Sequence, residues 1–345
     1  METLDICIAT YRLVNGNGID ISVLQFAREL SKKHNVTIAV TYTDMDLTGL
    51  NTLTYKVSAT SGVRSTAKDL DKKRFDLIST HYSPFDLIAS LTKTPHYLHD
   101  PGIPPFSVLK GLNNKRLWTV VNTMRLLSSR NACMVLPISN YLGEEYRRKY
   151  LYRGPIDTLP YGIEFPEDMP PMDDPPFEKY ILYVGRHTPY KGVHQLINIF
   201  RDVKKELGDD IHLVTIGNSE SGYYEYLRAL SKKVGNVHIK GYVPDVWSYY
   251  SNASVYATCS SWEGQDRPVI EAQYMGKPAV SFNNCSHPEV IMYGSLANDP
   301  ADFKNALIKH LTGDKKDPSI KERIKSKYSM GSMVQRFIDL VKPGY

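Results

Sequence analysis

Two glutamates spaced eight residues apart carry the most informative chemistry in this chain. Glu263 and Glu271 lie in the segment SWEGQDRPVIEAQYMGKPAV, which has the pattern of a loop, a helix start and a small-residue turn. Pro268 suits the first turn of a helix, where its missing N–H would have no partner anyway. The pattern therefore predicts that Glu263 lies in a loop and Glu271 about one turn inside the helix.

Both acids then face one helix N-terminus, whose unpaired N–H groups and positive dipole end hold anions such as phosphate. Carboxylates beside such a site accept hydrogen bonds from the hydroxyls of a sugar and a ribose. One ligand that combines these three features is a nucleotide-diphosphate sugar.

A pair of cations lies upstream in a matching context. Arg186 and Lys191 occur in YILYVGRHTPYKGVHQLINIF, where residues 180–184 form an apolar β-run, Gly185 breaks it, and an amphipathic helix begins near Gly192. A strand that leads into a basic loop places both cations at the carboxyl edge of a sheet, where open α/β folds bind ligands. The guanidinium fork and the compact ammonium together fit a diphosphate. Each motif alone arises often by chance, but their order and context together are much less common.

These motifs and several others resemble a family-4 retaining glycosyltransferase of the GT-B fold, in the group known as glycosyl transferases group 1. The resemblance covers nearly the whole chain. It rests on the ordered segments NGNGIDISVLQFARELSKKHNVTIAV, PHYLHDPG, LPISNYLGEEYRRKY, DTLPYGIEF, VGRHTPYKG, GYVPDVWSYYSNASVYATCSSWEGQDRPVIEAQYMGKPAVSF and HPEVI. It implies an α/β fold with two Rossmann-like domains, whose parallel sheets face a central cleft.

The resemblance also implies roles for the acidic segment. Glu263 would accept hydrogen bonds from hydroxyls of the donor sugar, and the backbone N–H groups of Gly264 and Gln265 would face the same sugar. Glu271 would bind the ribose hydroxyls. This chain departs from the family at Asp266, where small residues are usual. A carboxylate there is unfavourable near a diphosphate unless it points outward or pairs with Arg267.

In the first half of the chain, the resemblance singles out His99 and a glycine-rich turn. His99 would hydrogen-bond a sugar hydroxyl or steady the transition state, although an isolated histidine is more often a structural residue. His81 is a weaker candidate, and Asp100 would either orient His99 or begin the turn. Gly16 and Gly18 would let the backbone approach the donor, while a tight strand-to-helix turn explains them almost equally well.

The implied reaction is sugar transfer with retention of the anomeric configuration. His99, Glu263, Arg186 and Lys191 are the expected catalytic residues, and the two cations would stabilise negative charge on the departing nucleotide diphosphate. These cations would replace the divalent metal of other sugar transferases, so we expect no metal and no cofactor. Closure of the two domains would bring His99 to the donor and exclude water.

The bulk properties of the chain fit a soluble two-domain enzyme. Its 345 residues exceed a typical single core, and the net charge of +5 does not by itself imply nucleic acid. The four cysteines are scattered, which argues against a zinc site or a disulfide framework. The N-terminal segment METLDICIATYRL does not have the pattern of a signal peptide, and no run of about 18 apolar residues occurs. We therefore expect a cytoplasmic protein.

Apolar β-runs alternate with helical patterns in two series, which predicts parallel sheets covered by helices. Residues 1–165 form the predicted acceptor domain, and residues 177–328 the predicted nucleotide-sugar donor domain. The segment 166–176 is rich in proline and acids and is interpreted as a linker. The last helix, about 329–345, would pack back on the first domain.

Basic charge is concentrated between residues 101 and 153, where nine lysines and arginines oppose two glutamates for a net charge of +7. Within it, residues 104–153 mix basic and apolar side chains at partly helical spacing. One interpretation is an amphipathic helix with a solvated basic face. The other is attachment to an anionic membrane surface, where a lipid-linked acceptor would be met and the protein would be peripheral on the inner face. No nucleic-acid motif accompanies the charge, so no nucleic-acid partner is expected.

The expected partners are a UDP- or GDP-linked hexose-type donor and a hydroxyl acceptor on a sugar, a glycan or a lipid-linked substrate. Two other functions stay open at this point: a sugar-nucleotide epimerase or phosphorylase of the same fold, and a non-catalytic nucleotide-sugar-binding scaffold. Conversion of the free donor without an acceptor would indicate the epimerase. Acceptor contacts would come from the loops 43–66 and 102–125, which carry no recognisable code.

Overall fold

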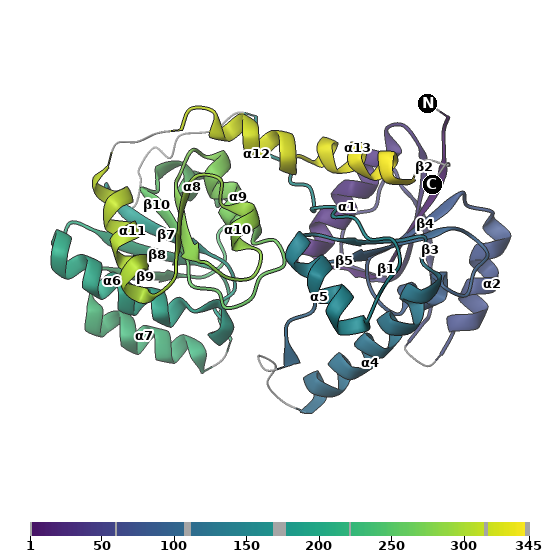
Figure 1. The fold of residues 1–345 in the computed structure, drawn as a ribbon, viewed down its shortest axis with the longest axis horizontal. Helices are drawn as coiled ribbons and strands as arrows, with labels where there is room; N and C mark the ends of the chain where they lie inside the picture. The colour runs from purple at the N-terminus through teal and green to yellow at the C-terminus, as the bar shows by residue number, and fades with distance from the viewer. Residues whose placement is uncertain are drawn as a thin grey trace. The chain divides into compact units, whose positions relative to one another are not determined.

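The chain folds into two compact units. The computed structural model describes residues 2–58, 61–106, 112–167, 177–220, 222–313 and 317–341. Unit 1 contains Met1–Glu164 and Tyr328–Tyr345, and unit 2 contains Phe165–Lys327. Of the linker predicted at 166–176, residues 168–176 lie outside the described residues. Each unit holds a six-stranded parallel sheet with interleaved helices, which confirms the expected α/β fold class (Figure 1). The expected cleft stays a prediction.

The sheet of unit 1 has the strand order β3-β2-β1-β4-β5-β6, and every neighbouring pair is parallel. Its strands are β1 (Asp5–Leu13), β2 (Asn35–Thr43), β3 (Asn51–Thr54), β4 (Leu77–Thr80), β5 (His96–Asp100) and β6 (Met134–Pro137). Its helices include α1 (Gly18–Ser31), α2 (Val63–Lys73), α3 (Phe85–Ala89), α4 (Leu112–Ser128), α5 (Asn140–Tyr150) and α13 (Met330–Val341), with the short turn η2 (Ser129–Asn131).

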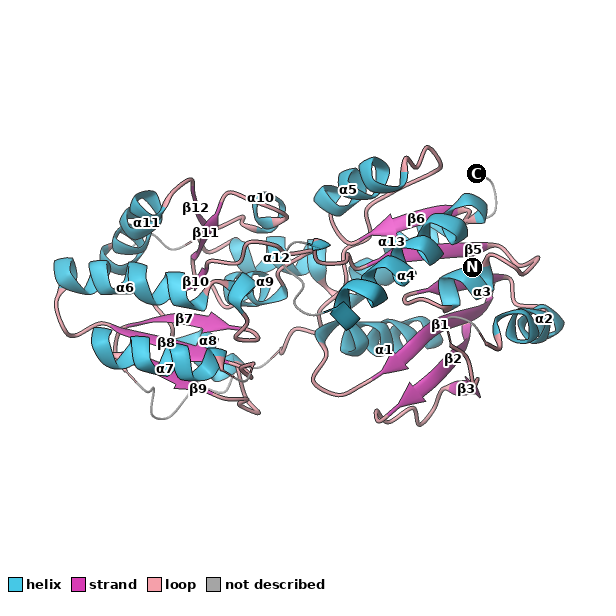
Figure 2. Ribbon diagram, turned by 90° about the horizontal axis from the view of Figure 1, so that it is seen from below, coloured by secondary structure: helices cyan, strands magenta, loops and turns pink. Residues whose placement is uncertain are grey.

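Helices cover both faces of this sheet (Figure 2). The central strand β1 has no exposed surface from Ile6 to Ala9, as expected for a parallel strand buried on both sides. On one face α13 lies along α1, where the rings of Phe26 and Phe337 meet edge to face at 5.1 Å (Figure 1). A second buried cluster packs against the helices α2 and α3 and contains Cys7, Ala9, Ala39, Leu70, Ile78, Phe85 and Ile88.

The sheet of unit 2 has the order β12-β11-β10-β7-β8-β9 and is also parallel throughout. Its strands are β7 (Tyr180–Val184), β8 (His212–Ile216), β9 (Val237–Lys240), β10 (Val255–Thr258), β11 (Ala279–Phe282) and β12 (Gly294–Ala297). The helices are α6 (Val193–Leu207), α7 (Tyr223–Val234), α8 (Trp247–Asn252), α9 (Arg267–Tyr274), α10 (His287–Val290), α11 (Pro300–Thr312) and α12 (Ile320–Tyr328), with the turn η3 (Pro189–Lys191) after β7.

The chain order of these strands decides where unit 2 can bind a ligand. From β7 the chain continues outward through β8 and β9, and then returns to place β10 on the other side of β7. The boundary between β7 and β10 is thus a topological switch point, and open α/β sheets bind ligands at the carboxyl ends of the strands beside such a point. The loops that follow β7 and β10 carry the two predicted motifs.

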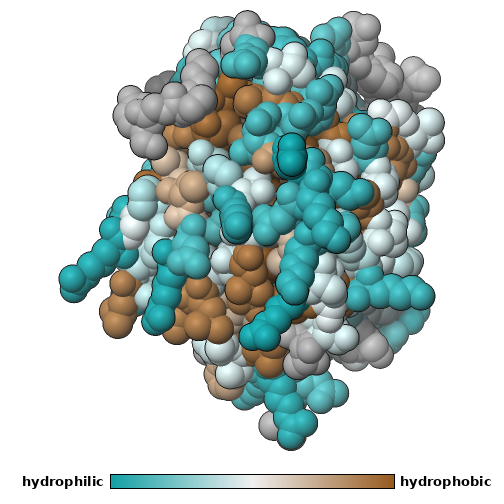
Figure 3. Space-filling view, turned by 90° about the vertical axis from the view of Figure 1, so that its right-hand side faces the viewer, coloured by the Kyte–Doolittle hydropathy of each residue, from teal (hydrophilic) through white to brown (hydrophobic). Residues whose placement is uncertain are grey.

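None of the described helices is both long and apolar enough to cross a bilayer. On the face drawn in Figure 3, hydrophobic side chains form separate small patches between hydrophilic ones.

Candidate functional site

The loop after β7 is held close to the end of β10 by a glycine. Gly192 follows η3 with φ +69, and a Cβ at this position would collide with the carbonyl oxygen of Cys259, just beyond β10. The backbone of Ser261 also donates a hydrogen bond to the carbonyl of Tyr190 at 2.8 Å. Only glycine therefore allows the two loops to approach, and this approach brings Lys191 to the acidic loop.

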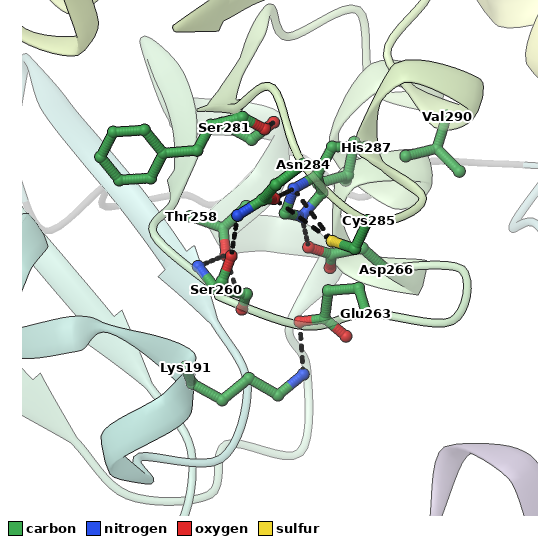
Figure 4. A network of polar contacts seen from close by, with 12 residues as sticks. Lys191, Thr258, Ser260, Glu263, Asp266, Ser281, Asn284, Cys285, His287 and Val290 are labelled. Carbon is green, nitrogen blue, oxygen red and sulfur yellow. Dashed lines mark hydrogen bonds and ion pairs between the residues drawn. The ribbon is translucent and has the colours of Figure 1, made fainter. Parts of the chain in front are cut away.

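Lys191 and Glu263 form a buried ion pair at the switch point (Figure 4). The Lys191 Nζ lies 2.5 Å from Glu263 Oε1, and the two side chains are 18% and 9% exposed. Burial and the neighbouring Asp266 raise the pKa of Glu263, while Lys191 offsets part of that rise. Burial alone would lower the pKa of Lys191, but Glu263 and Asp266 outweigh it and raise that pKa. The structure thus brings these two predicted residues together.

The second predicted glutamate lies on α9 and has partners for both carboxylate oxygens. As the sequence predicts, α9 begins at Arg267 with Pro268 in its first turn, and Glu271 follows one turn later. Arg267 Nε donates to Glu271 Oε1 at 2.7 Å, and the Tyr250 hydroxyl donates to Oε2 at 2.9 Å. This arrangement fixes the Glu271 carboxylate and points to Tyr250, on α8, as a supporting residue that the sequence analysis did not identify.

Asp266 corrects one expectation from the sequence. Its side chain is buried rather than outward, and its Oδ2 lies 2.9 Å from Nε2 of His287, while Arg267 pairs with Glu271. Burial alone would lower the pKa of His287, but the hydrogen bond to Asp266 and the nearby Cys285 raise it to about 10. Asp266 is therefore neutralised by a buried imidazolium, and no simple spacing rule indicates such a pair.

Arg186 does not join the Lys191–Glu263 pair. It follows Gly185 at the end of β7, is exposed, and donates from Nη2 to the Tyr190 hydroxyl at 3.1 Å. The neighbouring His187 is fully buried, and its Nδ1 contacts Ser219 Oγ at 2.7 Å. Burial lowers the pKa of His187 to about 4, so this ring is neutral. Arg186 is thus the more accessible cation of the predicted pair.

The glycine-rich turn of unit 1 assigns different roles to its two glycines. Gly16 has φ +77, a conformation that favours glycine, whereas Gly18 is the first residue of α1 and has open space around its Cα. Asn17 caps the helix, because its Oδ1 accepts hydrogen bonds from the N–H groups of Ile19 and Asp20 at 3.0 and 3.4 Å. The strand-to-helix turn accounts for Gly16, and Gly18 leaves the helix start uncovered by a side chain.

His99 lies inside unit 1 in a fully buried aromatic cluster. Its Nε2 is 2.9 Å from Ser79 Oγ, its ring stacks on His81 at 4.1 Å, and Phe26 and Phe337 flank it. Its Nδ1 has no hydrogen-bond partner among the described residues. Burial lowers the pKa of His99 to about 3, so the ring is neutral. A direct contact between His99 and a ligand would require this cluster to open, and the catalytic role stays a prediction.

A buried charge cluster corrects the expectation for Arg125 and decides between the two alternatives for Asp100. Arg125 of α4, counted among the basic surface residues of 104–153, is only 3% exposed and pairs with Asp100, with Asp86 at 3.9 Å. Asp100 also accepts a hydrogen bond from the N–H of Gly102 at 3.0 Å. Asp100 therefore stabilises the turn after β5 and binds Arg125, and neither of these contacts involves His99.

In the part of the chain that the structure describes, no group of three or more His, Cys, Asp or Glu side chains has an arrangement that could hold a metal ion. The acidic side chains of this loop and helix pair with cationic side chains: Glu263 with Lys191, Glu271 with Arg267, and Asp266 with His287.

Comparison with known proteins finds a family match for unit 2. Residues 165–327, the same residues as unit 2, match the family described as glycosyl transferases group 1. The chain is 27% identical to the O-antigen chain mannosyltransferase B of Escherichia coli over 177 residues, which are 50% of this chain and 44% of that protein. It also spans 30% and 37% of the lengths of two other curated relatives, from Haemophilus influenzae and Bacillus subtilis.

Two comparisons extend over most of the chain. A diphosphoundecaprenol α-1,3-galactosyltransferase of Escherichia coli is 23% identical over 303 residues, which are 81% of this chain and 77% of that protein. The crystal structure of Anabaena HepE with UDP and glucose superposes with a TM-score of 0.72, covering 99% of this chain and all of HepE at 13% identity. At that identity the structural likeness concerns the fold.

Proposed function

We propose that the chain is a retaining glycosyltransferase that moves a hexose-type sugar from a UDP- or GDP-linked donor to a hydroxyl acceptor, since unit 2 matches the family model of the glycosyl transferases group 1. The family match covers the donor unit, and several curated relatives that match the chain are named as glycosyltransferases.

The observation that carries this proposal is the Lys191–Glu263 pair at the switch point. A cation and a carboxylate only 2.5 Å apart suit adjacent parts of one ligand, a phosphate group and a sugar hydroxyl. In a nucleotide-diphosphate sugar the phosphate is joined to the anomeric carbon of the same sugar, and this carbon–oxygen bond breaks during transfer. Glu271 and Tyr250, on the neighbouring helices, would then meet the ribose farther along the same ligand.

In this reaction the chain's cations would stabilise the departing diphosphate. We propose that Lys191 and Arg186 stabilise that charge together with the N–H groups at the start of α9. We propose that this stabilisation takes the place of a divalent metal. Glu263 would orient the sugar, and the leaving phosphate would assist deprotonation of the acceptor on the same face, which retains the configuration.

Binding of the donor nucleotide can be tested without an acceptor. Thermal unfolding of the wild type should shift upward with one class of nucleoside diphosphate, UDP or GDP, in the presence of a chelator. In Glu271→Ala the shift should fall to less than half, because the variant loses the proposed ribose contact. Glu225→Ala, on an exposed helix position of the same unit, serves as the control and should keep the full shift. No shift with any nucleotide would contradict the proposed donor site, and donor conversion without acceptor would favour an epimerase.

We further propose that the acceptor is lipid-linked and is met at an anionic membrane through α4. The exposed face of α4 combines the apolar Val120 and Leu127 with Arg116, and the exposed Arg130 follows in η2. Basic and apolar groups on one helix face fit the interface of an anionic bilayer. This placement also suits a chain that matches a transferase named for a diphosphoundecaprenol substrate. Residues 107–111, within the predicted stretch, lie outside the described residues.

Vesicle binding tests this membrane contact. The wild type should cosediment with vesicles that contain about one third phosphatidylglycerol, and removing Arg116 and Arg130 together should weaken binding about 25-fold, since each basic residue contributes about 1 kcal/mol near such a surface. Tyr242→Ser, an exposed position in unit 2, is the matched control and should bind as the wild type does. Equal binding to neutral vesicles, or no loss in the double variant, would contradict the membrane contact.

A further inference from the structure

Two residues beside the candidate site adopt a backbone conformation that glycine usually occupies. Asp266 has φ +41 immediately before α9, and Cys285 has φ +43 in the loop before α10. A non-glycine residue in this region costs on the order of 1 kcal/mol and persists only where its surroundings hold it. The two positions are linked by the same side chain, His287, which contacts both of them.

His287 is the centre of a fully satisfied buried network (Figure 4). Its Nε2 lies 2.9 Å from Asp266 Oδ2 and its Nδ1 lies 2.8 Å from Asn284 Oδ1. Asn284 in turn donates from Nδ2 to the carbonyl of Ser260, at the end of β10, at 3.3 Å. Both ring nitrogens face acceptors, so the geometry suits a doubly protonated ring. The network joins the loop before α9 to the loop before α10.

The same cluster has a charge balance that depends on this ring. Glu263 and Asp266 are two buried carboxylates, and Lys191 and His287 are the two cations that face them. Asp266 raises the pKa of Glu263, whereas Lys191 and His287 lower it. Without the charge on His287, two carboxylates would compete for one lysine.

We propose that His287 is a positioning residue that acts through Asp266: it compensates the Asp266 charge, so that Lys191 stays paired with Glu263 and the loop before α9 keeps its geometry. This inference rests on the proposed glycosyltransferase function. A small residue at position 266, as is usual in the family that the sequence resembles, would carry no charge. Asp266 carries a buried charge, and His287 supplies the cation that compensates it. Besides Asp266, the titratable groups near His287 in the described network are Glu263, Lys191 and Cys285.

The decisive comparison uses three variants with matched chemistry. His287→Gln keeps a polar side chain but leaves Asp266 without its cation, so kcat for sugar transfer should fall about tenfold or more, because an uncompensated buried charge remains. Asp266→Gly removes the carboxylate and the strain of the positive φ at this position, so its kcat should fall by less than threefold. The double variant should behave like Asp266→Gly. If the His287–Asp266 hydrogen bond only connected the two loops, both single variants should lose kcat equally. That result would overturn the proposal.

The pH profile supplies a second readout that a purely structural role would not move. Because His287 lowers the pKa of Glu263, the acid limb of kcat/KM should shift to higher pH in His287→Gln. Because Asp266 raises the same pKa, the limb should shift to lower pH in Asp266→Gly. Unchanged limbs in both variants would contradict the compensation.

Nuclear magnetic resonance separates this inference from the proposed function. The ring nitrogen shifts of His287 in the full chain should show an imidazolium through pH 8.5 in the wild type and a neutral ring in Asp266→Gly. A charged ring in a protein that transfers no sugar would leave the pair intact and contradict only the transferase function. A neutral ring at pH 8.5 in an active wild-type enzyme would contradict only the role of His287.

Discussion

Replacing Glu263 by alanine is expected to abolish sugar transfer while the protein still folds. The carboxylate is the acceptor proposed for the hydroxyls of the donor sugar, and it lies at the switch point beside the cation that would hold the diphosphate. Loss of one preorganised polar group in such a site costs about 10² to 10³ in kcat. Nucleotide binding should persist, because Glu271 and α9 do not depend on the Glu263 side chain for their contacts.

The initial rate of sugar transfer is measured with the donor that the thermal-shift experiment identifies. The unfolding temperature of each variant is measured in parallel to check that it folds. Glu263→Gln is the matched variant, because it keeps the size of the side chain and removes its charge. It should also lose at least about tenfold, since a carboxylate forms stronger hydrogen bonds with hydroxyls than an amide does. Transfer by Glu263→Ala at more than a tenth of the wild-type rate would remove Glu263 from the reaction.

The sequence predicts most of this fold because buried parallel strands are recognisable in it as apolar runs. The runs YILYVG and IHLVTIG lie in β7 and β8, and the buried VTIAV lies in β2. The apolar-run pattern does not predict the edge strands β3 and β12, because their sequences NTLT and GSLA are short and mixed in polarity. They become strands because the edges of β2 and β11 offer unpaired backbone N–H and C=O groups, which no local sequence pattern records.

The site is predictable in part for the same topological reason. Lys191 and Glu263 are 72 residues apart, yet each follows a strand whose carboxyl end lies at one sheet edge. Burial is what the sequence does not reveal. His99 is covered by Phe26 and Phe337, which come from opposite ends of unit 1 in the chain.

Charge pairing inside the protein is equally hidden in the sequence. Asp266 directly precedes α9 and His287 begins α10, 21 residues later, and only the fold places their side chains in contact. Arg125 looks like one more surface cation of α4, but Asp100 and Asp86 bind it in the interior. A count of charged residues along the chain therefore overstates the basic surface of unit 1 and overlooks the neutralised acid of unit 2.

Lys191→Met should have the second large effect, on both activity and stability. The lysine is the buried cation proposed for the departing diphosphate, so its loss should lower kcat about 10² to 10³. It also leaves Glu263 buried without its closest cation, and breaking such a pair costs about 3–5 kcal/mol at a pH where the remaining charge persists. Lys191→Arg, which keeps the charge, should retain the stability and part of the activity.

The pH dependence of the stability loss distinguishes this electrostatic account from a simple packing defect. Burial and Asp266 already raise the pKa of Glu263, and Lys191 is the main group that opposes this rise. Without Lys191 the folded pKa rises further above the unfolded value, so the folded variant holds a proton that the unfolded chain releases. Stability then falls as pH rises through that interval. Chemical denaturation should accordingly show a larger deficit for Lys191→Met at pH 8 than at pH 5, whereas equal deficits would indicate lost packing and contradict a charged Lys191–Glu263 pair.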